Sequence, residues 1–300
     1  MLPFGLRMTT PVRVAPGPHP AATQRPPGFR DLFLRLDFVR LVLRGWRDLG
    51  TRGRLLQYLV DTDLKRTHAD TVMGQVWWLI DPFFSMAIYS ILVTVVFAKQ
   101  IPDAPLFLFA AILPWQWFQT SLLDATTSVT AHGNLIRQIQ FPKIILPAAS
   151  TIAGTITFGF GLVSLALLYV IYPRHLSAWM LAFPIVAAVQ YVFTLALAIL
   201  FSAVNTYYRD VQNLLRHATR IWFYASPAIY AVTALQGTVF RFVLGLNPFT
   251  YILTSYRNIA YSGTAPDWVG LAAVLVLSLV LLTFAIWVFK RVETGFAKIL

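Results

Sequence analysis

The chain has 300 residues, of which 57% are hydrophobic and only 12% are charged, against about 25% charged residues in a typical soluble domain. This composition and a mean hydropathy of +0.65 exclude an ordinary soluble protein and indicate a membrane-embedded one. The net charge of +12 would suit a nucleic-acid partner, but the cations are distributed in a way that indicates membrane topology instead. The absence of Cys excludes disulfides and thiolate metal sites.

The N-terminal 75 residues divide into two parts. Residues 1–29 are rich in Pro and poor in large apolar side chains, which predicts a disordered cytoplasmic tail. Residues 30–75 are predicted to form amphipathic helices at the cytoplasmic interface. In the first of these, Arg40 and Arg44 share one face, and Val42 and Trp46 share the other. Such a helix is typical of one lying flat on a membrane; packing on a soluble partner is the alternative.

Six apolar runs are long enough, or nearly so, to cross about 30 Å of hydrocarbon as helices. The predicted fold is therefore an all-α polytopic membrane protein with six spans over residues 76–300. The fifth run is the weakest, since it is short and contains Pro227. The runs cover residues 76–98, 105–123, 144–172, 179–204, 221–235 and 268–289.

The loops between these runs differ in charge. With both termini on one side, 20 of the 24 Lys and Arg fall on that side, and Lys99, Arg174, Arg241 and Arg257 fall on the other. The positive-inside rule therefore predicts that both termini are cytoplasmic.

Asp81-Pro82 follows the aromatic entrance to the first run. Two interpretations stay open at this point. The carboxylate either faces a cavity within the membrane, or it caps a helix that has proline at its first position.

A polar break at residues 132–147 separates the second and third runs. It carries Arg137 and Lys143, and places Leu135, Ile136 and Ile139 on one side of a helical turn. We interpret this break as a cytoplasmic elbow that an external protein pushes on.

Two later segments are also interrupted. Residues 205–220 contain Arg209-Asp210 and predict a cytoplasmic interfacial helix, followed by a span that bends at Pro227. Residues 233–266 hold two short apolar stretches separated by Asn247-Pro248. They predict a hairpin that dips into the membrane from outside and returns, with an ordinary external hairpin as the alternative.

The motifs of an enzyme or a motor are missing from the sequence. The five His have no metal-ligand spacing, and no Gly-Lys dipeptide exists, so there is no phosphate-binding loop for ATP. Energy for any transport would therefore come from another chain.

Four stretches together resemble the permease subunit of ABC exporters for cell-envelope polysaccharides such as O-antigen and teichoic acid. They are LVDTDLKRTHADTVMGQVWWLIDP (59–82), residues 113–150 with the elbow, YYRDVQNLLRHATRIWFYASPAIY (207–230) and LNPFTYILTSYRNIAYSG (246–263). The chain departs from the family pattern in two places: residues 1–50 are longer, and Asp81 stands where Glu or Gln is expected.

The resemblance implies a function and a set of partners. Two copies of this chain would form a conduit for a lipid-linked polysaccharide in the bacterial cytoplasmic membrane, with no nucleic acid involved. Two copies of a separate ATPase would bind ATP and Mg²⁺, so this chain would itself hold no cofactor and would not be an enzyme. Arg137 and Lys143 would contact the ATPase or, alternatively, lipid phosphates. The implied coupling residues are Asn134, Leu135, Ile136, Arg137, Ile139, Phe141, Lys143, Arg209 and Asp210.

A sugar polymer needs flat apolar surfaces in a wet path, which aromatic side chains provide. The predicted conduit residues are Trp78, Phe84, Tyr89, Trp222, Tyr224 and Tyr230. Packing in the core or at the membrane interface is the alternative for each of them. Other functions stay open for the chain as a whole: a permease of the same fold for a drug or lipid, a membrane-embedded glycan-processing enzyme, or a structural anchor.

Overall fold

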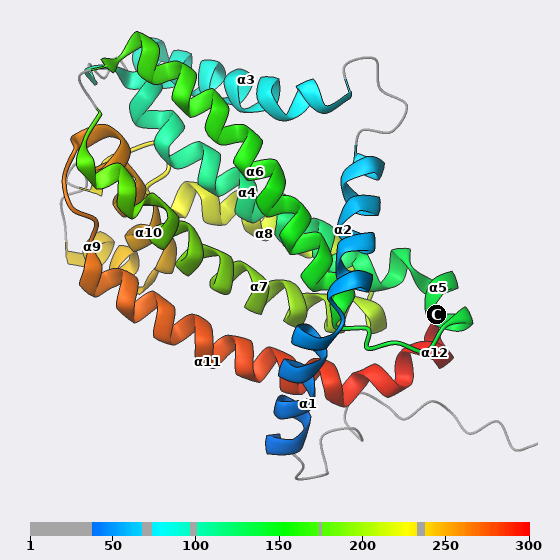
Figure 1. Cartoon of the computed structure of the whole chain (residues 1–300). Coiled ribbons are helices and arrows are strands. Elements are labelled where there is room, and N and C mark those ends of the chain that lie inside the picture. Colours follow the sequence, from blue (N-terminus) through cyan, green and yellow to red (C-terminus); the bar gives the residue numbers. More distant parts are fainter. Residues whose placement is uncertain (1–37, 68–73, 97–100, 174–175, 233–237) are drawn as a thin grey trace, which may run out of the picture.

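A computed structural model describes residues 38–67, 74–96, 101–173, 176–232 and 238–300. The described part is all helical, without strands (Figure 1). The predicted tail 1–29 lies outside the described residues, as do residues 30–37 of the predicted amphipathic segment. The helices are α1 (Phe38–Thr51), α2 (Gly53–Thr67), α3 (Trp77–Ile91), α4 (Ala104–Ala131), α5 (Gly133–Gln138), α6 (Ile145–Ile171), α7 (Phe183–Tyr207), α8 (Val211–Ala225), α9 (Thr238–Leu246), α10 (Pro248–Arg257), α11 (Trp268–Val292) and α12 (Phe296–Ile299).

Four helical segments are long and apolar enough to cross a membrane: α4, α6, the segment Ala178–Tyr207 that contains α7, and Trp268–Gly295 that contains α11. They form the body of the bundle, in which α4 packs on α6 and α7, and α7 packs on α11. The first predicted span is a shorter helix, α3, of 15 residues. The chain is thus membrane-embedded through four long helices.

The fifth predicted span differs most from expectation. A single helix, α8, begins at Val211 and ends at Ala225, so it includes both the predicted interfacial helix and the start of the predicted span. It ends there because Pro227 disfavours helical backbone at the preceding residue, and Ser226 is extended, with φ −105° and ψ 152°. Residues 233–235 of that span lie outside the described residues.

The bundle has two ends with different contents. We call the end that carries α1, α2, α5 and α12 the charged end, and the end that carries α9 and α10 the hairpin end (Figure 1). An aromatic core built around Trp115, Phe118 and Phe249 fills the hairpin half. A second core around Ile286, Phe289 and Phe296 fills the charged half.

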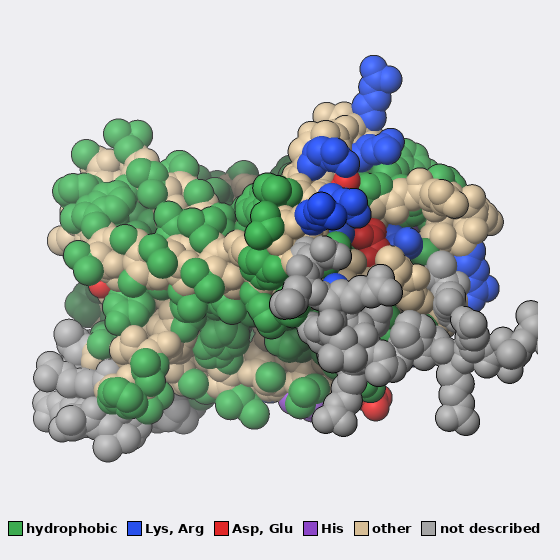
Figure 2. All heavy atoms as spheres, turned by 90° about the horizontal axis from the view of Figure 1, so that it is seen from below, with side chains coloured by type: hydrophobic (Ala, Val, Ile, Leu, Met, Phe, Trp, Pro, Cys, Tyr) green, Lys and Arg blue, Asp and Glu red, His purple; other side chains and the backbone are tan. Residues whose placement is uncertain are grey.

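Helices α1 and α2 cross the long helices at the charged end instead of running along them (Figure 1). Helix α1 packs closely on α11, since a Cβ added at Gly45 would lie 2.2 Å from a methyl carbon of Ile286. Val42 is buried in this contact, whereas Val39 and Trp46 remain exposed. Figure 2 shows Lys and Arg gathered toward this end, whereas apolar side chains are spread over the part of that face toward the other end.

Two side chains, the Asn247 amide and the Arg257 guanidinium, hold the hairpin end together. Asn247 accepts hydrogen bonds from the Trp222 indole and the backbone N–H of Phe249, and donates to Ala225 and Ser226, so it joins α8 to α10. Arg257 is 5% exposed and donates to the backbone carbonyls of Phe107, Ala228 and Tyr230. It was predicted to lie in an external loop, but it is buried beneath the turn that follows α8.

Candidate functional site: a polar groove and an elbow

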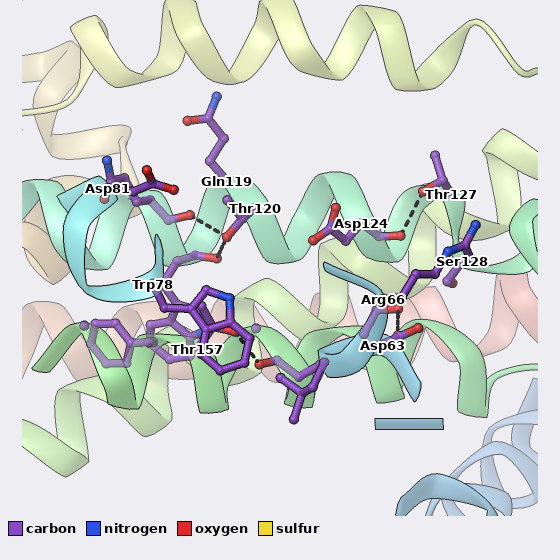
Figure 3. Close-up of a pocket in the computed structure, with 18 of the residues that line it drawn as sticks. Asp63, Arg66, Trp78, Asp81, Gln119, Thr120, Asp124, Thr127, Ser128 and Thr157 are labelled. Carbon is purple, nitrogen blue, oxygen red and sulfur yellow. Dashed lines mark hydrogen bonds between the residues drawn. The ribbon is translucent and has the colours of Figure 1, made fainter. Parts of the chain in front are cut away.

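A groove of about 680 Å³ is bounded by α2, α3, α4 and α6 (Figure 3). Its floor is a stripe of polar side chains along one side of α4. These residues recur every three to four positions, which places them on one helix face. The stripe consists of Gln116, Gln119, Thr120, Asp124, Thr127 and Ser128.

The part of this stripe that lies nearer the hairpin end is held by contacts to neighbouring helices. The Gln116 amide donates to the Ser85 hydroxyl on α3 at 2.6 Å, and the Gln119 amide donates to the Thr219 hydroxyl on α8 at 3.3 Å. Thr120 instead donates to the carbonyl of Gln116 in its own helix. Its exposed side chain therefore needs no partner on another helix.

Acidic side chains reach the groove from three helices: Asp63 from α2, Asp81 from α3 and Asp124 from α4. The Ser150 hydroxyl donates to Asp63 at 2.7 Å, which orients that carboxylate. Among the described residues, no group of three or more His, Cys, Asp or Glu has the arrangement of a metal site.

The position of Asp81 decides between its two interpretations. Helix α3 begins at Trp77 and continues through Pro82, so Asp81 is an internal helical residue and the prediction that it caps the helix is wrong. Its side chain is exposed and lines the groove, which supports the cavity interpretation.

Aromatic side chains that are almost fully buried lie beside these polar groups. The rings of Trp117 and Phe158 stack with centroids 4.3 Å apart and an interplanar angle of 15°, and both residues line the groove. Trp78, a predicted conduit residue, also lines it and packs on Phe160 at 5.0 Å.

The other predicted conduit residues lie elsewhere. Tyr89 packs on Phe223 of α8 and interacts with Tyr224, and the Tyr230 hydroxyl donates to the Tyr224 carbonyl. Phe84 is 60% exposed on α3.

Trp222 belongs to the aromatic core, where its ring meets Phe118 and Phe249, and its indole N–H is occupied by Asn247. The packing alternative therefore applies to Trp222.

The elbow forms at the charged end. Helix α5 carries Asn134, Leu135, Ile136 and Arg137. A non-helical segment with Ile139 and Phe141 follows it, and Lys143 lies in the turn before α6. Asn134, Arg137 and Ile139 are exposed, and Leu135, Phe141 and Lys143 are half-buried. Arg209 and Asp210 are exposed in the turn between α7 and α8.

One predicted contact residue is not available at the surface. Ile136 is 5% exposed and belongs to the core of the charged half, together with Phe296. The helical-turn argument placed it on the same side as Leu135 and Ile139, but the chain becomes extended at Ile139 (φ −130°, ψ 138°), so the three side chains do not form one outward face.

The elbow is attached to the end of α11. The backbone N–H of Lys143 donates to Glu293 at 2.5 Å, and Glu293 also accepts from the Lys290 ammonium at 2.7 Å. A displacement of the elbow would therefore act directly on a long helix.

The sequence reasoning missed the polar stripe on α4. Its signal was present, since Gln116, Thr120 and Thr127 recur with helical spacing inside an apolar run. No comparable pattern in the sequence indicated that α8 packs on α4.

The fold and the groove together define a polytopic helical membrane protein with a polar site inside its bundle. Residues 54–261 match the family described as ABC-2 type transporter, and the chain belongs to this family. It is 32% identical over 261 residues to the O-antigen export system permease protein RfbA of Myxococcus xanthus, covering 87% of this chain and 99% of that protein. It is 27% identical over 254 residues to the protein of the same name from Klebsiella pneumoniae, covering 84% and 97% of the two chains. The family resemblance seen in the sequence is confirmed, and membership of a transporter family agrees with a role in transport.

Proposed function

We propose that this chain is the permease subunit of an ATP-driven exporter that moves a lipid-linked polysaccharide across the bacterial cytoplasmic membrane. The observation that carries this proposal is the groove, because polar and flat aromatic side chains share one 680 Å³ space inside a membrane-embedded bundle. The names of its relatives, which are O-antigen export permeases, support a polysaccharide as cargo.

The groove has the chemistry that a glycan requires. Sugar hydroxyls need donors and acceptors, which Gln116, Thr120 and Asp124 offer. The aromatic residues that a pyranose ring would stack on, Trp78 and Trp117, border the groove but are only 5% and 3% exposed, so they would have to be uncovered for stacking. An apolar drug or a lipid tail would gain nothing from this polar stripe. It would leave the donors and acceptors of the stripe buried and unpaired, which costs free energy.

The charged end is the cytoplasmic end in this proposal, and both termini lie in the cytoplasm. The charge distribution supports this orientation. Helix α1 would lie at the membrane surface, since Val39, Leu43 and Trp46 are exposed beside Arg40 and Arg44.

Helices α3 and α8 would supply the two remaining crossings, and α9 and α10 a re-entrant hairpin. Phe249, at the turn between α9 and α10, packs on Trp115 with centroids 4.8 Å apart. Trp115 lies about 16 Å along α4 from Ala104, at a rise of about 1.5 Å per residue. The hairpin turn therefore lies well inside the bundle, away from the end of α4 at Ala104.

A second copy of the chain would complete the conduit. Helix α3 exposes Phe84, Ile88 and Ile91 on one face, and α8 exposes Leu214 and Ile221. These apolar faces flank the side of the molecule on which Tyr89 and Tyr224 meet. A homodimer formed there would enclose the tyrosines between two subunits.

A separate ATPase, in two copies, would dock at the elbow and bind ATP and Mg²⁺. The exposed Asn134, Arg137 and Ile139 would contact it, with Arg209 and Asp210 as a second contact. The bond from Lys143 to Glu293 would transmit the movement to α11.

The test is complementation with matched variants. Wild-type chain, expressed with its ATPase in a strain that lacks the chromosomal copy, should restore surface glycan, measured with a glycan-specific antibody. Thr120→Val combined with Asp124→Asn should lower export at equal protein level. Thr283→Val is the matched control, because that hydroxyl on α11 also bonds only its own helix. Unchanged export in the groove variant, or restored lipid or drug efflux without surface glycan, would contradict the proposal.

A further inference from the structure

Helix α8 carries two cations at a depth where a membrane protein rarely leaves them unpaired. The side chains of Arg216 and Arg220 are exposed, and they share one face of α8 with Asn213 and Tyr224. Within the described ranges, neither arginine has a carboxylate partner. The opposite face, with Leu215, Thr219 and Phe223, is buried.

The depth follows from two contacts between α8 and α4. Thr219 bonds Gln119 at 3.3 Å, and Phe223 packs on Trp115 with centroids 5.5 Å apart. From Thr219 to Phe223 the chain of α8 moves four residues toward its C-terminus, while the contacted residue on α4 moves four residues toward the N-terminus. The two helices therefore run antiparallel side by side (Figure 1). Arg220 is level with the middle of α4, about 22 Å from Ala104, and Arg216 lies about one turn nearer the charged end.

This depth removes Arg220 from the ordinary partners of a surface arginine. Helix α4 has 28 residues and is about 42 Å long, whereas the hydrocarbon core is about 30 Å thick. Arg216 lies about one turn nearer the charged end, whereas the middle of α4, which is level with Arg220, lies within that core and away from lipid headgroups. A charge there must face a water-filled cavity or pair with an anion.

The neighbours of Arg220 are polar and aromatic. It lies within electrostatic range of Tyr89 on α3, which itself interacts with Tyr224. The arginine face is thus continuous with the tyrosines that the proposed dimer would enclose.

We propose that Arg216 and Arg220 bind an oxyanion of the transported molecule, a phosphate or a carboxylate, as it passes the middle of the membrane. Guanidinium groups form paired, charge-assisted hydrogen bonds with phosphate and carboxylate oxygens. Two arginines one turn apart on a helix contact one diphosphate or two successive acidic sugars. This inference rests on the proposed export function and adds a charge requirement on the cargo.

The direct test is binding to the purified complex of this chain with its ATPase, in neutral detergent. The probes are geranylgeranyl diphosphate, the uncharged alcohol geranylgeraniol, and an acidic oligogalacturonide. Wild type should bind at least one anionic probe and not the alcohol; the diphosphate identifies a phosphate source and the oligogalacturonide a carboxylate source. Arg216→Gln combined with Arg220→Gln should weaken that binding about tenfold or more, because charge-assisted hydrogen bonds are lost.

Arg52→Gln combined with Arg54→Gln removes the same charge from two exposed positions, one in the break between α1 and α2 and one at the start of α2, and it should leave binding unchanged. Equal affinity of wild type for the diphosphate and the alcohol, or equal binding by wild type and the α8 variant, would overturn the inference. So would a variant that loses the dimer mass in native mass spectrometry while keeping its anion affinity, since the arginines would then serve subunit pairing.

Export separates this inference from the proposal on which it rests. If wild type fails to restore surface glycan, the proposed function fails. If wild type restores it and the Arg216 and Arg220 variant, at equal protein level, exports equally well, only the oxyanion site fails.

Discussion

The ammonium of Lys290 lies 2.7 Å from the carboxylate of Asp48, which joins the end of α11 to α1. The lysine side chain is only 7% exposed, and the same ammonium lies 2.7 Å from Glu293. Since Glu293 also accepts from the backbone N–H of Lys143, one buried cation ties together α1, α11 and the elbow. These are the elements that would have to move together if an ATPase acts at the charged end.

Replacing Lys290 by Met should strongly destabilise the chain. Removing one member of a buried ion pair leaves uncompensated charge and costs about 3–5 kcal/mol. We expect a lower midpoint of thermal unfolding, measured by heating detergent-solubilised protein and following the monodisperse peak in size-exclusion chromatography. Lys65→Met, at an exposed position of α2, is the control and should not change it.

A double-mutant cycle with Asp48→Asn isolates the pair. Because the two residues are in contact, the two losses should not add. Strictly additive losses would show that the pair itself contributes nothing to stability.

Two isoleucines of the elbow should respond in opposite ways to the same substitution. Ile136 is buried against the core of the charged half, whereas Ile139 is 54% exposed. Ile136→Asp should therefore unfold the chain, at a cost of about 4 kcal/mol or more. Ile139→Asp combined with Arg137→Glu should leave it folded but prevent copurification of the ATPase.

The measurement is a pull-down of the ATPase at matched amounts of folded permease. If Ile139→Asp with Arg137→Glu retains both the ATPase and export, the elbow is not the contact. If Ile136→Asp folds normally, the assigned burial is wrong.

The long helices were predictable because their apolar runs are long and their loops carry asymmetric charge. The runs at 105–123, 144–172, 179–204 and 268–289 all lie in helices that are long enough to cross. The helix breaks at the elbow and at Asn247-Pro248 were also predictable from the sequence, because helix ends have local chemical signals.

The sequence failed where tertiary contacts decide the position of a residue. Hydropathy divided residues 205–235 into an interfacial helix and a separate span, because it cannot show that Thr219 bonds Gln119 and that one helix, α8, runs through Arg216 and Arg220 alongside α4. It could not show that Arg257 is buried, because no local pattern shows that three backbone carbonyls receive its guanidinium. Aromatic density identified Trp78 in the groove but also Trp222, whose role in packing is set by Asn247.

Arg257 should not be replaceable by lysine. Its planar guanidinium donates to carbonyls in two separate segments, α4 and the turn after α8, and its central carbon lies 4.0 Å from the centroid of the Phe107 ring. A lysine ammonium cannot reproduce this fork. Arg257→Lys and Arg257→Gln should both reduce the yield of folded protein in detergent, whereas Arg44→Gln, at an exposed site on α1, should not. A normal yield and melting midpoint for Arg257→Lys would contradict this role.

The close packing of α4 on α6 should depend on Gly154. A Cβ added at this position would lie 2.0 Å from the Ser121 hydroxyl and 3.1 Å from its Cβ. Overpacking of this kind costs about 1–3 kcal/mol, so Gly154→Ala should lower the melting midpoint. Gly159→Ala is the matched control on the same helix, since a Cβ there meets nothing within 4 Å.

Ser121 offers a rescue of the Gly154 variant. Its hydroxyl is buried and has no hydrogen-bond partner in the part of the chain that the structure describes, so Ser121→Ala alone should be neutral or stabilising, because it removes an unsatisfied polar group. The double variant Gly154→Ala with Ser121→Ala should recover part of the lost stability, because the 2.0 Å contact disappears while the 3.1 Å contact remains. A double variant no more stable than Gly154→Ala alone would show that the hydroxyl does not limit the approach of the two helices.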